Sequence, residues 1–210
     1  SVTLPHKRTV MQFLDRVHGL AQHIGAVNTI LNVDGVLTGY NTDCEGAMRA
    51  LEETTALSGK KVVLLGSGGA ARAIAFGLQE KNADVLILNR TPEKALDLAK
   101  ATSARFGDLS MLSEVKKSDI LINATSAGML SGAGETLVPK EMLHENLTVF
   151  DIVYNPQETT LITEAKKTGC DIIYGYKMFL YQAVLQFELF TGSAAPVSIM
   201  EETLLKNLEQ

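Results

Sequence analysis

The sequence predicts an α/β protein built around a doubly wound parallel sheet. Short apolar runs, typical of strands buried on both faces, carry this prediction. They lie at residues 61–65, 84–88, 119–123 and 148–153. Helical signals separate these runs, notably at 70–81 and where Pro92 follows the capping residue Thr91. Strands that alternate with helices indicate βαβ units and a parallel sheet covered by helices on both sides.

Composition narrows the class of protein. The 210 residues are 46% hydrophobic and 20% charged, which is typical of a globular protein with a sizeable core. The net charge of −5 and the lack of a basic run argue against a nucleic-acid partner. No apolar run reaches the roughly 18 residues of a membrane helix. Cys44, Cys170 and the four histidines show no metal spacing, so we expect no metal site and a reduced compartment.

The segment before residue 55 differs in texture from the rest. We expect a strand at Val2-Thr3-Leu4, a helix over 8–23, and strands at 26–31 and 36–37 joined by a turn. Asn41-Thr42-Asp43 predicts the start of a helix, with Thr42 or Asp43 as its cap. A boundary near 54–60 should separate this front segment from the doubly wound part.

A glycine-rich loop follows the first buried strand. Gly66-Ser67-Gly68-Gly69-Ala70-Ala71 fits G-x-G-x-x-A between a predicted strand and a predicted helix. In this Rossmann-like arrangement the glycines allow a tight turn and the approach of a pyrophosphate, which the free N–H groups of the helix bind. The context favours a dinucleotide site, although such loops also occur as plain strand-to-helix turns.

The next strand ends in Asn89-Arg90-Thr91, with Lys94 one turn further on. An NAD site usually carries Asp or Glu here, about 20 residues after the first glycine, to bind the ribose 2′-hydroxyl. Arg90 instead offers a planar fork of donors suited to a phosphate, which favours NADP. The alternative is that Arg90 only solvates the end of the strand.

Several short motifs together carry a family resemblance. They are, in order, SVTLPHK, IGAVNTI, GYNTDCEG, LGSGGAARA, LNRT, NATSAGM, DIVYNP and GYKMFLYQA. In this order they resemble shikimate dehydrogenase over essentially the whole chain. That resemblance implies reversible reduction of 3-dehydroshikimate to shikimate with NADPH, in the shikimate pathway of aromatic amino acid biosynthesis. It also implies a cytoplasmic location, or a plastid one in a plant.

The resemblance assigns roles to individual residues. Lys7 and Asp43 are implied to be the catalytic pair. The residues implied to bind the substrate are Thr3, Asn28, Tyr154 and Gln182. The residues implied to hold NADP are Gly66, Gly68, Gly69, Ala70, Asn89, Arg90, Thr91, Lys94, Thr125, Ser126, Ile152, Gly175 and Met178. We therefore expect a partial substrate-binding domain at 1–55, an NADP-binding domain at 56–176 and C-terminal helices at 177–210 that return to the substrate domain.

The sequence departs from the familiar bacterial pattern at three points. Ser1 stands where Asn is usual, and Cys44 replaces the glycine after Asn-Thr-Asp. Both features resemble the dehydrogenase part of bifunctional dehydroquinate dehydratase–shikimate dehydrogenases, which implies a fused dehydratase upstream. The family's first strands and its Ser-x-Ser segment would also lie upstream of Ser1. Two alternatives follow: an enzyme acting on quinate, or a non-catalytic NADP-binding module.

Taken one by one, the same residues allow plainer interpretations. Lys7 alone would be a surface lysine, and Asp43 a helix cap. The Asn28 amide in an apolar strand needs a partner, which a neighbouring loop could supply. Gln182 could be exposed surface and Tyr154 a packed loop aromatic. Without a histidine partner the Cys44 thiol is a packing residue, and Ser126 lacks the pattern of a nucleophile elbow.

Overall fold

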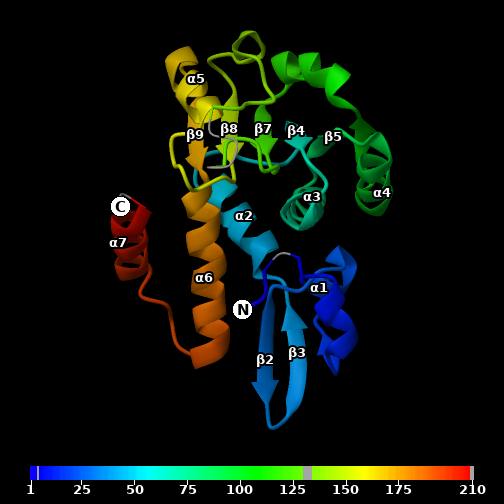
Figure 1. Cartoon of the computed structure of the whole chain (residues 1–210), viewed down its shortest axis with the longest axis vertical. Helices are drawn as coiled ribbons and strands as arrows, with labels where there is room; N and C mark the ends of the chain where they lie inside the picture. Colours follow the sequence, from blue (N-terminus) through cyan, green and yellow to red (C-terminus); the bar gives the residue numbers. More distant parts are fainter. Residues whose placement is uncertain (4, 130–133, 209–210) are drawn as a thin grey trace.

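The computed structural model describes residues 1–3, 5–129 and 134–208. Two sheets lie at opposite ends of an elongated molecule, and helices α2 and α6 run between them (Figure 1). The six-stranded sheet has the order β6-β5-β4-β7-β8-β9, and the smaller sheet has the order β1-β3-β2.

The large sheet is parallel throughout. Its strands are β4 (Lys61–Leu65), β5 (Asp84–Leu88), β6 (Arg105–Gly107), β7 (Ile120–Asn123), β8 (Thr148–Asp151) and β9 (Asp171–Tyr174). The order reverses between β4 and β7, so the chain winds outward from the centre in both directions. Ligands of open parallel sheets bind outside the carboxyl ends of the strands at such a switch point.

Helices cover both faces of this sheet, which explains its apolar strands. Val62 and Leu64 join a core with helices α3 (Gly69–Glu80) and α4 (Pro92–Thr102). Val63 and Leu65 point to the other face and pack with the 3-10 helix η2 (Leu109–Lys117) and helix α5 (Thr160–Thr168). A second 3-10 helix, η4 (Lys140–Met142), lies on that side as well.

The small sheet lies at the other end of the molecule. A turn at Asp34-Gly35, both with positive φ, joins β2 (Thr29–Val33) to the antiparallel β3 (Val36–Tyr40). The two-residue strand β1 (Arg16–Val17) pairs with the other edge of β3 in parallel. The 3-10 helix η1 (Thr9–Phe13) precedes β1, and helix α1 (Gly19–Ile24) follows it.

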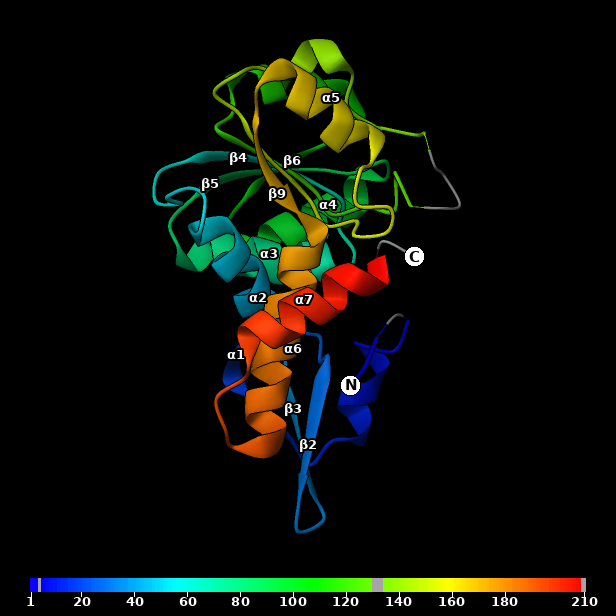
Figure 2. The ribbon, with the colours of Figure 1, turned by 90° about the vertical axis from the view of Figure 1, so that its left-hand side faces the viewer.

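Three long helices complete the fold. Helix α2 (Thr42–Glu52) leads from the small sheet to the large one, and α6 (Gly175–Thr191) runs back beside it. They cross closely at Gly46, where an added Cβ would lie 2.7 Å from the backbone nitrogen of Gln182. Helix α7 (Val197–Leu208) then turns back along α6 (Figure 2). Among the described residues, no helix is both long and apolar enough to cross a membrane.

The strands predicted at 26–31 and 36–37 are found at Thr29–Val33 and Val36–Tyr40. The front segment also differs from its prediction at three further points. The helix predicted over 8–23 is wrong, because η1, β1 and α1 share that range. Main-chain pairing with β3 decides this: Asp15 N donates to Leu37 O at 3.1 Å and His18 N to Gly39 O at 2.8 Å. Val2 and Thr3 form no strand, and Leu4 lies outside the described residues.

The third difference concerns the cap of α2. Asn41, rather than Thr42 or Asp43, is the N-cap, and its side chain accepts from Cys44 N at 3.2 Å. The strands predicted at 61–65 and 84–88 are confirmed to the residue. The C-terminal helix begins at Gly175, two residues earlier than predicted, and residues 209–210 lie outside the described part.

Candidate active site

An ion pair between Lys7 and Asp43 stands at the junction of the two ends of the molecule. Lys7 Nζ lies 2.7 Å from Asp43 Oδ2, and the two side chains are 15% and 8% exposed. Lys7 comes from the N-terminal segment, and its carbonyl accepts from Val27 N at 2.8 Å. Asp43 lies in the first turn of α2, where a carboxylate is favoured. Such a short, largely buried pair holds an ammonium group in a fixed place.

Asn28 ties this pair to the strand and to α6. Its Nδ2 donates to Asp43 Oδ1 at 3.0 Å and to Thr42 Oγ1 at 2.9 Å, and lies 3.5 Å from Gln182 Oε1. Its Oδ1 accepts from Thr42 N and from Thr29 Oγ1. All polar atoms of the Asn28 amide are therefore used, and the buried Asn28 holds the Asp43 carboxylate in one orientation.

The side chain of Lys7 lies against the glycine loop. A Cβ built on Gly69 would lie 3.8 Å from Lys7 Cδ, so the lysine stem crosses the start of α3. Gly66 has φ 106°, and a Cβ there would lie 2.7 Å from Ala124 O, which only glycine tolerates. A Cβ on Gly68 would meet nothing within 4 Å, so this stretch of backbone is open to a ligand.

The first turn of α3 has the donors that an anion needs. No side chain caps the helix at Gly68, a residue within the described part, so the N–H groups of Gly69 and Ala70 have no capping partner. A helix N-terminus with free N–H groups binds phosphate through those donors and the helix dipole. The loop geometry and the donor set therefore fit a dinucleotide pyrophosphate.

The other predicted cofactor residues follow the carboxyl ends of neighbouring strands. Five neighbouring strands of the sheet end at the same level, because the last residue of each pairs with the last residue of the next. In sheet order these residues are Leu88 (β5), Leu65 (β4), Asn123 (β7), Asp151 (β8) and Tyr174 (β9). Each predicted segment begins at or just after one of these strand ends. The segments are Asn89-Arg90-Thr91, Gly66–Ala70, Thr125-Ser126, Ile152 and Gly175. The sheet thus brings these segments to one edge.

The Asn89–Lys94 segment presents its cations to solvent. Asn89 Nδ2 donates to Thr91 O at 2.8 Å, which holds the turn into α4. Arg90 and Lys94 are exposed, and within the described ranges neither forms an ion pair. Two positive charges at the end of β5 are free to meet a phosphate group.

The start of α6 approaches the end of β8. A Cβ on Gly175 would lie 2.5 Å from the carbonyl of Ile152, so only glycine permits this contact. Met178, one turn later, is buried. Tyr154 is 41% exposed and stacks on Phe179, with ring centroids 4.9 Å apart.

Not every predicted substrate residue joins the hydrogen-bonded network. Gln182 lies beside Asn28, and its Nε2 donates to Phe179 O at 3.0 Å. Thr3 is exposed, and its hydroxyl makes no hydrogen bond with any described residue. The structure therefore brings together Lys7, Asp43, Asn28 and Gln182. Thr3 and Tyr154 are exposed and lie outside this hydrogen-bonded group.

The loop with Thr125 and Ser126 is held by a buried polar network that sequence reasoning missed. Thr125 Oγ1 donates to Asn123 Oδ1 at 2.7 Å, and Ser126 is exposed. Asn123 Nδ2 donates to Asp151 Oδ1 at 2.9 Å. The signal was present in the sequence, because both residues are polar groups ending otherwise apolar strands at the same level of the sheet.

Asp151 is the centre of that network and has no solvent exposure. Besides Asn123, Val153 N donates to its Oδ1 at 3.1 Å and Thr159 Oγ1 donates to its Oδ2 at 2.7 Å. Burial raises the pKa of the Asp151 carboxyl, while these hydrogen bonds pull that pKa down. The three donors fix the loops after β7 and β8.

Cys44 lies next to the ion pair but is a packing residue. It is 2% exposed and belongs to an apolar cluster with Ile24, Ala26 and Ala73. Burial raises the pKa of its thiol to about 12. A thiol that stays protonated is a poor nucleophile.

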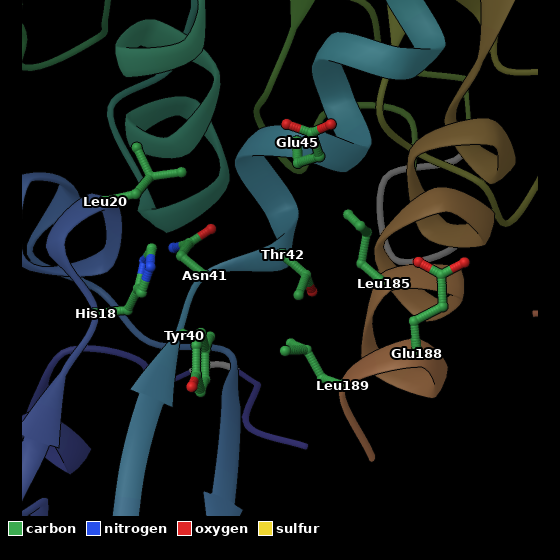
Figure 3. A pocket seen from close by; sticks show the side chains of 9 residues that line it. All are labelled: His18, Leu20, Tyr40, Asn41, Thr42, Glu45, Leu185, Glu188 and Leu189. Atoms are coloured by element: carbon green, nitrogen blue, oxygen red, sulfur yellow. The ribbon is translucent and has the colours of Figure 1, made fainter. Parts of the chain in front are cut away.

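A separate pocket of about 350 Å³ opens beside this site (Figure 3). It is lined by His18, Leu20, Tyr40, Asn41, Thr42, Glu45, Leu185, Glu188 and Leu189. None of these is a predicted site residue, and the lining is mainly apolar. Its closest link to the ion pair is Thr42, whose hydroxyl accepts from Asn28.

The sheet order and the glycine loop define the chain as an α/β protein of the Rossmann type. Family models place it further. The model described as shikimate / quinate 5-dehydrogenase matches residues 48–161. The shikimate dehydrogenase substrate binding domain matches residues 1–30, and the shikimate 5′-dehydrogenase C-terminal domain matches residues 175–205. The chain belongs to the shikimate dehydrogenase family.

Individual relatives agree with this placement. Shikimate dehydrogenase (NADP(+)) of Methanothermobacter thermautotrophicus is 46% identical over the whole of this chain and 77% of the relative. A bifunctional 3-dehydroquinate dehydratase/shikimate dehydrogenase of Arabidopsis thaliana is 42% identical over 98% of this chain and 37% of the relative.

Solved structures agree with the fold as well. Shikimate 5-dehydrogenase of Thermus thermophilus, solved with NADP(H) and shikimate, has a TM-score of 0.88 and 40% identity. That likeness covers 95% of this chain and 75% of the Thermus chain.

Proposed function

We propose that this protein reduces 3-dehydroshikimate to shikimate with NADPH, reversibly, as its relatives are named to do. The observation that carries the proposal is the Lys7–Asp43 pair, which stands 2.7 Å apart against the glycine loop at Gly69. A ketone reduction needs a proton donor fixed beside a nicotinamide, and this arrangement supplies one.

Lys7 is the proposed acid. Its ammonium hydrogen-bonds the ketone oxygen, stabilises the negative charge that develops there and transfers a proton to it. The bound nicotinamide supplies the hydride that reaches the carbonyl carbon. The neutral amine then regains a proton from solvent, so one hydride and one proton convert the ketone to the alcohol. In the oxidation direction the amine accepts that proton.

Asp43 and Asn28 keep this acid in place. Asp43 orients the ammonium through Oδ2, while Asn28 holds Oδ1 at 3.0 Å. Thr3, Tyr154, Gln182 and Asn28 are the proposed contacts for the substrate hydroxyls. The Asn28 amide is already fully hydrogen-bonded, so it would have to release one of its present bonds to bind a hydroxyl. A site built from donors and acceptors rejects analogues that lack the matching hydroxyl.

The residues at the sheet edge are the proposed NADP site. Gly66, Gly68, Gly69 and Ala70 would hold the pyrophosphate, and Arg90 with Lys94 would bind the 2′-phosphate beside Asn89 and Thr91. Thr125 and Ser126 would line the adenosine side. Ile152, Gly175 and Met178 would border the nicotinamide. No carboxylate ends β5 to bind a free 2′-hydroxyl, which supports the preference for NADPH.

Two binding titrations and one measurement of turnover test the proposal. NADPH and 3-dehydroshikimate are titrated separately, and turnover is then measured with both. We expect both ligands to bind and NADPH to be oxidised only when the ketone is present. Binding of NADPH without turnover would instead favour the non-catalytic NADP-binding module.

Quinate is the second candidate substrate. The matching family model names both alcohols, and a quinate dehydrogenase from Corynebacterium glutamicum has a TM-score of 0.91 with 33% identity. Comparing kcat/KM for shikimate and quinate under the same conditions separates the two. We expect shikimate to be the better substrate, and a higher value for quinate would reverse the assignment.

Three broader expectations belong to this proposal. We propose a substrate-binding domain at 1–55, an NADP-binding domain at 56–176 and C-terminal helices at 177–210 that return to the first. The free thiols of Cys44 and Cys170 support a reduced compartment, cytoplasmic or plastid. The Arabidopsis relative supports the prediction of a fused dehydratase upstream.

A further inference from the structure

Arg72 joins the glycine-loop helix to the segment that carries the ion pair. It lies in the first turns of α3, and its backbone N donates to Gly68 O at 2.9 Å. Its guanidinium leaves the large-sheet side and donates from Nε to the carbonyl of Ile24, at the end of α1. A Cβ on Gly25 would lie 3.7 Å from that guanidinium.

The receiving carbonyl has a reason to need this donor. Gly25, in the left-handed conformation, ends α1, and its N–H bonds back to Ala21 and Gln22. The last carbonyls of a helix have no partner within that helix. Arg72, from another part of the fold, supplies a donor to the Ile24 carbonyl. The planar guanidinium fixes the direction of that donor.

The guanidinium of Arg72 also lies near an aromatic ring. Its central carbon is 5.5 Å from the centre of the Phe76 ring, and Phe76 packs on the cluster that includes Ile24 and Ala73. This cluster joins α1, α2 and α3. The guanidinium is therefore held by a hydrogen bond and by an aromatic ring, which a solvated arginine would not be.

A short path leads from this contact to the ion pair. Three residues after Ile24, Val27 N donates to Lys7 O at 2.8 Å, and Asn28 follows with its bonds to Asp43. Gly69, which Lys7 crosses, lies three residues before Arg72. Arg72 therefore spans the two segments that must be aligned for hydride and proton to reach the same carbonyl.

We propose that Arg72 is a positioning residue that sets the glycine loop against the segment carrying Lys7 and Asn28. It acts through Ile24 O rather than by touching the substrate. This role rests on the proposed function for its effect on turnover, but its geometric part stands alone. A displacement of about 1 Å between reacting groups can cost about 100-fold in rate.

The test uses Arg72→Met, which keeps an unbranched side chain and removes the donors together with the charge near Phe76. We expect kcat to fall by about tenfold or more while the Kd for NADPH alone stays close to wild type. Arg72→Lys, which can donate one hydrogen bond to Ile24 O, should recover part of the lost rate. The matched control is Arg49→Ala, since Arg49 pairs with Glu45 on the exposed side of α2.

A distance measurement gives a readout that does not need turnover. Spin labels on Val33→Cys in β2 and Asp97→Cys in α4 report the separation of the two ends, and both native cysteines are buried. We expect the distance distribution to broaden in Arg72→Met and to stay narrow in Arg49→Ala.

Three results would overturn the proposal. One is a kcat for Arg72→Met within about twofold of wild type. Another is loss of NADPH affinity in proportion to kcat, which would make Arg72 a cofactor ligand. The third is a label-distance distribution in Arg72→Met that is as narrow as in wild type. If the wild-type chain does not reduce 3-dehydroshikimate, the proposed function fails, and the label distances still decide the role of Arg72.

Discussion

Asp43 and Asp151 are two buried carboxylates in surroundings of opposite kinds. Asp43 pairs with the Lys7 ammonium at 2.7 Å. Asp151 has only neutral donors, from Asn123, Val153 and Thr159, and burial raises its pKa. Burial alone therefore does not mark a carboxylate as catalytic. The counter-charge on Lys7 supports the role proposed for Asp43, whereas the neutral donors around Asp151 hold loops.

The largest effect should come from removing the charge beside Asp43. We expect Lys7→Ala to lower kcat by about 1,000-fold, because the ketone loses its acid, while substrate KM changes far less. Steady-state rates in both directions measure this. Lys60→Ala, which breaks an exposed pair with Asp119, is the matched control. Equal turnover in wild type and Lys7→Ala would rule out Lys7 as the acid.

The Asp151 side of the comparison predicts a loss of stability. Asp151→Ala leaves three buried donors unsatisfied and should cost about 3 kcal/mol in the free energy of unfolding. Urea unfolding measures it, with the exposed Asp97→Ala as control. Asp151→Asn keeps one acceptor and should cost less. Equal stability of wild type and Asp151→Ala would show that the network is dispensable.

A substitution at Arg90 tests whether this residue binds the 2′-phosphate of NADPH. Arg90→Asp replaces a donor of two charge-assisted hydrogen bonds by a repelling charge, so NADPH should bind about 100-fold more weakly. NADH should be barely affected. Fluorescence titration of both cofactors measures this, with Lys100→Asp, in the last turn of α4, as a control of equal charge change. Equal weakening of both cofactors would refute the 2′-phosphate assignment.

The raised pKa of Asp151 predicts a pH dependence of stability. The folded state keeps this proton at a pH where the unfolded chain, with an Asp pKa of about 3.9, has lost it. Stability from Asp151 is therefore lost as pH rises from the unfolded pKa to the folded pKa. The slope of that loss approaches about 1.4 kcal/mol per pH unit between the two values.

Asp151→Asn cannot titrate and serves as the reference for this pH dependence. The advantage of wild type over Asp151→Asn in unfolding free energy should shrink from about pH 4 upward, then level off above the folded pKa. An advantage that grows with pH would show that hydrogen bonds outweigh burial.

The smallest effect concerns an exposed ion pair on α2, the helix that carries Asp43. Arg49 Nε lies 3.2 Å from Glu45 Oε1, with side chains 40% and 54% exposed. Arg49→Ala should cost about 0.3–0.5 kcal/mol and leave kcat unchanged, because water screens such pairs. Thermal unfolding and steady-state rates check this. A loss above about 1 kcal/mol would show that burial is not what separates strong from weak pairs here.

The half of the fold that contains the six-stranded sheet could be predicted because its strands are buried on both faces. Apolar runs such as 61–65 and 84–88 have clear limits, and the structure reproduces them. The front half could not be predicted as well, because its pairing is tertiary. Residues 16–17 lie between η1 and α1 in the sequence, yet they form a strand because they pair with β3.

The same limit applies to the candidate site. Thr42 and Asp43 both suit an N-cap, but Asn28 and Lys7 use them, which leaves the cap to Asn41. Asp151 was missed although it is a polar residue at the end of an apolar strand, because its partners could not be assigned without the sheet order. Arg72 was missed because its partner, Ile24 O, comes from another element. The family motifs named Lys7, Asp43 and Asn28, whereas spacing alone would have left them as surface or cap residues.

We propose that Lys7, held by Asp43, faces the reacting carbon of the substrate beside the glycine loop. A crystal structure of the protein with NADP⁺ and shikimate is the decisive test of this placement. We expect Lys7 Nζ within about 3 Å of the reacting hydroxyl and of Asp43, with the nicotinamide beside them. Lys7 turned to solvent, away from both, would contradict it.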